Sequence, residues 1–179
     1  MDVRRLTPEH ARAYRAAMLE AYADPSGTFT ATVAERAALP LSWWEARVSD
    51  RPEAAERVFG AFAEAGLAGV AGLRFDRRPR TRHKATLFGL FVRPPFRGRG
   101  VARSLVDAVT EAARAAPGVR VLQLTVTETN GPALRLYERC GFVAFGVEPM
   151  ALRLGDRFLG KVHMWRRLDT EAGDRAAEM

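Results

Sequence analysis

A short turn rich in glycine and arginine, residues 97–102, joins the two most strongly patterned segments of this chain. The apolar run before it, residues 87–92, is typical of a buried strand, and apolar residues recur at helical spacing over 101–112. A strand that passes through glycines into a helix leaves free backbone N–H groups at the helix N-terminus, and such groups bind anions. Because Arg97 and Arg99 add positive charge, the turn predicts a pyrophosphate site.

The composition of the turn narrows the kind of phosphate ligand. A P-loop ends in Gly-Lys-Ser/Thr, which is absent here, and a Rossmann turn has three glycines at its own spacing. Both absences disfavour a nucleotide-binding protein. The order Arg-x-x-Gly-x-Ala, with Arg97, Gly100 and Ala102, instead resembles the acyl-CoA loop of the GCN5-related N-acetyltransferase (GNAT) superfamily.

A second motif follows about 30 residues later, after a predicted strand at 119–126. Residues 130–142 read Asn-Gly-Pro-Ala-Leu-Arg-Leu-Tyr-Glu-Arg-Cys-Gly-Phe. Pro132 suits the first position of a helix, and Gly141 suits the residue just beyond its end. The pattern resembles the CoA-contacting segment of GNAT enzymes that carries the catalytic tyrosine, here Tyr137. The two motifs stand in the family's order and spacing.

The resemblance implies one α/β domain of GNAT type over residues 1–168, with a mixed, mostly antiparallel central sheet, flanking helices and a splayed pair of parallel strands. It also implies direct transfer of an acetyl group from acetyl-CoA, a co-substrate, to a primary amine of a small molecule or a protein. The residues that the motifs place at CoA are Leu90, Phe91, Val92, Arg97, Gly98, Arg99, Gly100, Val101, Ala102, Ser104, Asn130, Ala133 and Tyr137.

The predicted elements follow that layout. A first helix is expected to start at Thr7-Pro8 and to end at about Tyr22. Further helices are expected at 32–38, 43–48, 101–115 and 131–140. Strands are expected at 58–63, 67–75, 85–92, 119–126, 142–147 and 159–168, with a hairpin turn at 64–66. An apolar segment at 150–154 precedes a turn at 155–156. The last residues, 169–179, lack periodicity and are predicted to form a disordered tail.

Composition is that of an ordinary soluble protein, with 47% hydrophobic and 27% charged residues. The chain has no apolar stretch of 18 residues and no apolar segment near its start, so neither a membrane span nor a secretory signal is expected. The single cysteine, Cys140, excludes an internal disulfide and fits a cytoplasmic protein.

The net charge of +7 comes from 28 basic and 21 acidic residues. Nearly all of the basic residues are arginine, which together with the many alanines indicates a coding bias, and CoA would use part of the positive field. The densest basic cluster, residues 77–82, has no interleaved aromatic residues. A solvated loop is therefore favoured there over a nucleic-acid patch, and no nucleic-acid partner is expected.

The predicted chemistry needs a polarised thioester carbonyl and a proton for the departing thiolate. In GNAT enzymes the strand before the CoA loop splays from its neighbour at a bulge, for which Gly89 is the candidate here. The backbone of Leu90, Phe91 and Val92 would then contact pantetheine and polarise the carbonyl. Tyr137 is the candidate general acid, because a phenol of pKa about 10 can protonate a thiolate whose thiol has a pKa of about 8.5.

Several of these residues have simpler alternatives. Tyr137 would also suit the core with its hydroxyl hydrogen-bonded, Asn130 either contacts pantetheine or only caps the helix, and Ser104 either contacts phosphate or lies on the surface. Cys140 is interpreted as core filling rather than as a nucleophile. No metal-ligand spacing occurs in the sequence, so no metal is expected.

No general base is predicted. Many GNAT enzymes carry a glutamate on the central strand, but residues 85–92 contain no acid. A chain of water molecules could also move the proton, and a lone histidine in a strand, as at 163, more often has a structural role. The remaining candidates are Glu35, Glu45, Glu148, His83 and His163.

The acceptor site is expected beside residues 29–48, the segment that lines it in this superfamily. Phe29, Trp43 and Trp44 would form aromatic walls, and core packing is the alternative for both tryptophans. The hairpin over 150–163 would close the other side. A homodimer is compatible with the sequence. The rival to an enzyme is a non-catalytic acyl-CoA-binding regulatory module, which the missing strand glutamate leaves open.

Overall fold

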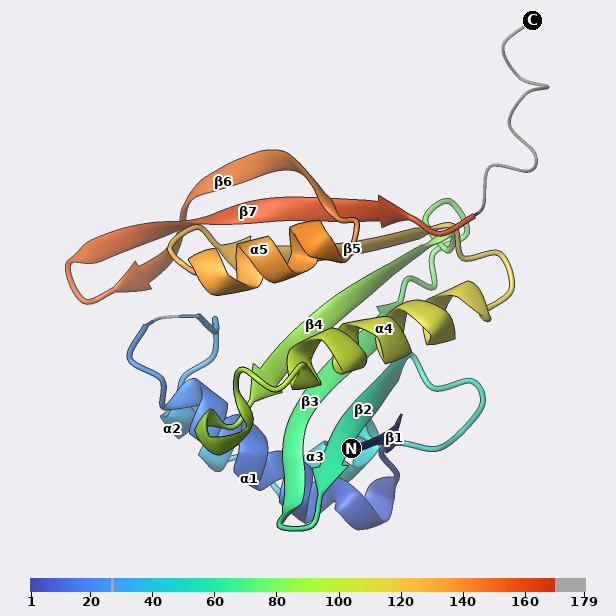
Figure 1. Cartoon of the computed structure of the whole chain (residues 1–179), viewed down its shortest axis with the longest axis vertical. Coiled ribbons are helices and arrows are strands. Elements are labelled where there is room, and N and C mark those ends of the chain that lie inside the picture. The colour runs from blue at the N-terminus through green and yellow to red at the C-terminus, as the bar shows by residue number, and fades with distance from the viewer. Residues whose placement is uncertain (27, 170–179) are drawn as a thin grey trace, which may run out of the picture.

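The computed structural model describes residues 1–26 and 28–169, which form one α/β domain around a seven-stranded mixed sheet (Figure 1). The strands lie in the order β1-β2-β3-β4-β5-β7-β6. Only β4 and β5 are parallel; every other pair of neighbours is antiparallel. The predicted fold class is therefore confirmed. The strands are β1 Asp2–Arg5, β2 Glu56–Ala63, β3 Gly66–Phe75, β4 Lys84–Val92, β5 Val121–Thr127, β6 Val143–Leu154 and β7 Arg157–Arg167.

Helices cover both faces of the sheet. α4 and α5 share a hydrophobic cluster with the side chains of β4 and β5 that face them, among them Leu87, Leu122 and Leu124. Figure 1 shows α4 crossing β3 and β4 on this face. α1 and α3 build a second cluster on the opposite face, against Val58 and Val70. The helices are α1 Ala11–Tyr22, α2 Val33–Ala37, α3 Leu41–Arg47, α4 Val101–Arg114 and α5 Gly131–Arg139.

The strand β4 contains an irregularity in its pairing at Gly89. Its pairing with β3 runs from Val70 opposite Phe91 to Gly72 opposite Phe88, so two residues of β4, Gly89 and Leu90, lie across from one residue of β3. Gly89 has φ +63°, a backbone conformation that disfavours residues with a Cβ. The residue singled out as the bulge candidate thus occupies a bulge.

The pairing of the parallel strands β4 and β5 ends before the bulge is reached. β4 pairs with β5 only over Lys84 to Thr86, and from Leu87 onward the two strands diverge (Figure 1). The expected splay of the parallel strands is confirmed. It leaves the edge of β4 that faces β5 without a ladder partner over the residues that carry the bulge.

Two elements differ from the sequence-based expectation. β1 was not expected, because its four residues show no alternation of apolar and polar side chains; pairing with β2 holds it in the sheet. β6 is one strand rather than two segments, with irregular pairing between Glu148 and Leu152 and with Met150 at φ +53°. The tail expected to be disordered lies, from residue 170 onward, outside the described residues.

Candidate functional site

The turn before α4 has the backbone that the sequence predicted for an anion site. Gly98 and Gly100 have φ values of +73° and +78°. Gly100 is the N-cap of α4 and supplies no side-chain cap, so the first N–H groups of the helix are left for a ligand. A Cβ at either glycine would meet nothing within 4 Å. The glycines therefore serve the backbone conformation and leave the approach to these N–H groups open.

A cavity of about 500 Å³ adjoins this turn, between β4, α5 and the loop after α1. It is lined from β4 by Leu90, Phe91 and Val92, whose backbone was expected to contact pantetheine. Arg97 reaches the same cavity and donates from Nε to the backbone oxygen of Val92 at 3.0 Å. The predicted CoA residues that it brings together are Leu90, Phe91, Val92, Arg97, Ala102, Asn130 and Ala133.

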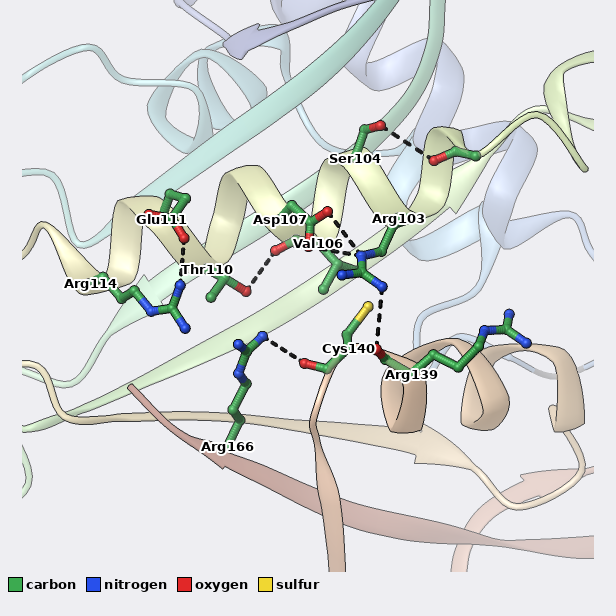
Figure 2. Close-up of polar contacts among 11 residues, drawn as sticks. Arg103, Ser104, Val106, Asp107, Thr110, Glu111, Arg114, Arg139, Cys140 and Arg166 are labelled. Atoms are coloured by element: carbon green, nitrogen blue, oxygen red, sulfur yellow. Dashed lines mark hydrogen bonds and ion pairs between the residues drawn. The ribbon is translucent and has the colours of Figure 1, made fainter. Parts of the chain in front are cut away.

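Other predicted CoA residues lie in the turn but not along this cavity. Gly98, Arg99 and Gly100 are exposed, and Val101 is buried as the first core residue of α4. Ser104 is exposed, and its hydroxyl donates to the backbone oxygen of Gly100 at 3.4 Å, as Figure 2 shows.

A second cavity of about 240 Å³ lies at the bulge. Both the bulged residues of β4 and Tyr137 of α5 contribute to its wall. It shares Phe29, Leu90 and Ala133 with the first cavity. The two hollows therefore meet at the split between β4 and β5, one leading to the helix N-terminus and the other to Tyr137.

Tyr137 is 6% exposed, and its ring packs edge-on against Phe142 with the centroids 5.8 Å apart. Burial, and to a smaller extent the neighbouring Cys140, raises the pKa of the Tyr137 phenol well above its usual value. The phenol is therefore neutral throughout the physiological pH range and holds a proton to give. No hydrogen bond to its hydroxyl occurs among the described residues.

Asn130 caps α5 and also lies beside both cavities. Its side-chain oxygen accepts from the backbone N–H of Ala133 at 3.2 Å and so caps α5. The same residue lines both cavities. Capping uses only the side-chain oxygen, which leaves the amide N–H groups as donors beside the cavities.

The end of α5 is fixed by arginines from two other elements (Figure 2). Arg103 of α4 donates to the backbone oxygen of Arg139 at 3.2 Å, and Arg166 of β7 donates to that of Cys140 at 2.6 Å. Arg103 is itself paired with Asp107. These contacts hold the helix that carries Tyr137 against α4 and β7. Cys140 is 2% exposed, burial raises the pKa of its thiol, and it lies among core residues as expected.

The candidate bases do not gather at the cavities. Glu148 and His163 form a pair across β6 and β7, with 3.3 Å between Oε2 and Nε2. Glu35 caps α2 by accepting from Thr32. None of the described residues that line the second cavity is an aspartate, a glutamate or a histidine. The described residues also contain no group of three or more potential metal ligands.

The three aromatic residues expected at the acceptor site lie in different places. Phe29 lines both cavities and packs edge-on against Tyr22 at 5.5 Å. Trp44 is fully buried beside Tyr14, so it packs in the core, the alternative considered for both tryptophans. Trp43 is half-buried and lines a separate hollow next to Arg47.

Sequence reasoning did not find two charged residues of the second cavity, Arg74 of β3 and Lys161 of β7. Lys161 donates to the hydroxyl of Thr30 at 2.7 Å, and Thr127 donates to the backbone oxygen of Thr28 at 3.3 Å. These bonds hold the loop after α1 over the ends of β5 and β7. Arg74 and Lys161 are 87 positions apart, and only the sheet order brings them to one cavity.

Comparison with known proteins identifies the class. Residues 15–142 match the sequence model of the acetyltransferase (GNAT) family, and the chain belongs to that family. It is therefore an acetyl-CoA-dependent acyltransferase. Among the described residues, no helix is long and apolar enough to cross a membrane.

Individual relatives agree with this assignment. The chain is 32% identical over 114 residues to the L-amino acid N-acetyltransferase AaaT of Escherichia coli, a match that covers 63% of this chain and 68% of AaaT. A GNAT-family acetyltransferase of Streptococcus pneumoniae has the same fold, with a TM-score of 0.84 at 22% identity over 94% of this chain and 99% of that one. YncA of Salmonella typhimurium, solved with its cofactor acetyl-CoA, gives a TM-score of 0.77 at 22% identity over 98% of both chains.

Proposed function

We propose that this protein transfers the acetyl group of acetyl-CoA directly to a primary amine in the split between β4 and β5. The observation that carries the proposal is the meeting of the two cavities at the bulge. One cavity extends to Arg97 and Ala102 at the N-terminus of α4, and the other contains Tyr137. A pyrophosphate at the turn, pantetheine along β4 and a thioester at the bulge would follow this path.

The path also supplies electrostatic help for the reaction. The ladder between β4 and β5 stops at Thr86, so backbone N–H groups on that edge of β4 have no strand partner beyond it. Pantetheine would occupy the gap, and these donors would stabilise the oxyanion of the tetrahedral intermediate. As the intermediate collapses, the C–S bond breaks, the thiolate takes the proton of Tyr137, and the new amide nitrogen loses one proton to solvent, from which Tyr137 is reprotonated.

Two relatives support this proposal. AaaT is named as an N-acetyltransferase that acts on amino acids, and YncA was solved with acetyl-CoA. The rival, a regulatory module that binds acyl-CoA without turnover, has no feature that specifically favours it. The missing strand glutamate does not do so, because the second cavity offers another way to obtain a neutral amine, which is argued below.

The coenzyme site is tested with Ala102→Glu. Ala102 lies in the first turn of α4, where glutamate favours the helix, so the fold is expected to persist. Its carboxylate would occupy the phosphate position, and two like charges about 4 Å apart at an effective dielectric constant near 20 repel by roughly 4 kcal/mol. Calorimetry should therefore show acetyl-CoA affinity reduced by more than about tenfold even if solvent screens half of this energy.

The matched control is Ala108→Glu, which adds the same charge to the same helix outside both cavities. Equal acetyl-CoA affinity in both variants would contradict the site. Catalysis is tested separately by an acceptor screen that follows release of free CoA thiol. Tight acetyl-CoA binding without acetylation of any amine in the screen would favour the regulatory module.

A further inference from the structure

The second cavity has a one-sided charge. Of the described residues that line it, Arg74 and Lys161 are cationic and none is anionic. The remaining lining side chains are mostly threonine hydroxyls and apolar groups. We propose that the acceptor is a small amine that also bears a carboxylate, and that Arg74 and Lys161 hold this carboxylate. The inference rests on the proposed acetyl transfer and names the class of its acceptor.

The sheet register places both cations on one face. Leu122, Leu124 and Val126 of β5 pack in the cluster of α4, so the alternate residues Thr125 and Thr127 point to the other face. Lys161 lies opposite Thr127 in the pairing of β7 with β5. On β3, Arg74 lies opposite Thr86 of β4, and its guanidinium is 5.9 Å from the centre of the Phe88 ring. The carboxylate would thus bind on the face away from α5, while Tyr137 approaches the thioester from the α5 side.

Neither cation is neutralised by an acidic side chain of the described residues. Among the described residues, no carboxylate forms an ion pair with Arg74 or Lys161; Lys161 donates only to the neutral hydroxyl of Thr30. Two acidic residues lie close to Lys161 in the strand pairing, Glu148 opposite it on β6 and Glu128 next to its β5 partner Thr127. Both have other partners. Glu148 pairs with His163, and Glu128 accepts the backbone N–H of Gly160 at 2.7 Å.

Other arginines of the domain show the contrast. Arg47 is paired with Glu56 at 3.3 Å, and Arg93 is paired with Glu20 at 2.9 Å. A cation that lines a concave site without an acidic partner is suited to bind an anionic ligand group. Two such cations converge from different strands on a cavity of about 240 Å³, which suits a small metabolite better than a folded protein surface.

The same charges bear on the missing general base. A nearby positive charge disfavours the ammonium form of the acceptor and lowers its pKa. Burial between Phe29 and Phe88 acts in the same direction. The amine would then lose its proton to solvent as it enters, and no glutamate on β4 is needed for this step.

The test compares an amino acid with its amide as acceptors, for example methionine with methioninamide and glycine with glycinamide. These pairs keep the amine and remove the negative charge. We expect at least one amino acid to be preferred over its amide in kcat/KM by about 10- to 100-fold, the range that a charge-assisted contact supplies. Arg74→Met and Lys161→Met should each reduce this preference by about tenfold or more, while KM for acetyl-CoA stays unchanged.

Two controls separate charge from structure. Lys161→Arg keeps a cation at this position, so most of the preference should remain. Arg78→Met removes a positive charge from the exposed loop between β3 and β4, away from the cavity, and should leave the preference intact. Urea unfolding of each variant verifies the fold.

The outcomes are distinct. If amino acids and their amides are acetylated equally well, or if Arg74→Met and Lys161→Met leave the preference unchanged, the carboxylate site is wrong and acetyl transfer stands. If peptides with a free N-terminus are better acceptors than any free amino acid, the acceptor is a polypeptide and the inference is likewise overturned. If no amine is acetylated although acetyl-CoA binds, both the proposed function and this inference fail.

Discussion

Replacement of Tyr137 with phenylalanine isolates the one hydroxyl on which the proposed mechanism depends. The ring would keep its edge-on contact with Phe142, and no hydrogen bond among the described residues is lost. The free energy of unfolding should therefore change by less than about 1 kcal/mol. General acid catalysis contributes about 10²- to 10⁴-fold, so kcat should fall by that factor, equal to about 3–5 kcal/mol of barrier.

The high pKa of Tyr137 does not weaken it as a donor in this setting. In the proposed mechanism the departing thiolate would form in the same cavity, and burial raises the proton affinity of a thiolate as it does that of a phenolate. Because the pKa of the phenol lies above its ordinary value of about 10, the ratio of kcat between wild type and Tyr137→Phe should be constant from about pH 6 to pH 9. A tenfold change of this ratio per pH unit would show that another group donates the proton.

The assay must report the chemical step. Single-turnover kinetics with saturating acetyl-CoA and a good acceptor separate acetyl transfer from product release. Tyr14→Phe is the matched control, since Tyr14 is also buried but lies in the cluster beneath α3, away from both cavities. A Tyr137→Phe variant whose single-turnover rate stays within twofold of wild type would refute the assignment of Tyr137 as the general acid.

Three further predictions test the surroundings of the site. Asn130→Ala should lower the free energy of unfolding by about 1 kcal/mol through the lost cap and also weaken acetyl-CoA binding, whereas Asn130→Asp should keep the cap and lose only affinity, as thermal unfolding and calorimetry would show. Trp44→Ala should cost about 3–5 kcal/mol of stability without changing the acceptor KM, because Trp44 is fully buried in the core. Burial raises the pKa of Tyr14, Tyr22 and Tyr137. The stability that these tyrosines contribute is therefore complete below the unfolded-state pKa and is lost as pH rises beyond about 10. The urea midpoint should fall in that range, and it should fall less steeply in Tyr137→Phe.

The parts of the site that the sequence predicted are those built from consecutive residues. The turn at 97–102 and the helix that begins after Asn130 depend on local backbone requirements, namely glycines at positive φ, a proline in the first turn and a cap. Gly89 could be singled out for the same reason. Such requirements are visible in a short stretch of sequence, so the backbone of the proposed coenzyme site followed from two motifs.

The elements that were missed depend on partners distant in the chain. β1 is a strand because β2 offers it a free edge, and β6 continues past Met150 because β7 pairs with it on both sides of the irregularity. Trp43 and Trp44 are adjacent in sequence, yet one is half-buried and the other is fully buried. Periodicity within a five- to seven-residue helix could not tell which of the two faces the core.

The acceptor half of the site could not be predicted for a physical reason that also explains its chemistry. Beside the bulge at Gly89 lies a cavity lined from several strands. In the proposed mechanism the α5 face would receive the leaving group through Tyr137, and the opposite face would receive the amine among side chains of β3, β4, β5 and β7. Because successive strand residues point to opposite faces, the charge of this second face depends on residues that do not pack in the core beneath α4. Acceptor choice can therefore change through single substitutions at positions such as 74 and 161 while the fold and the acetyl-CoA path stay intact.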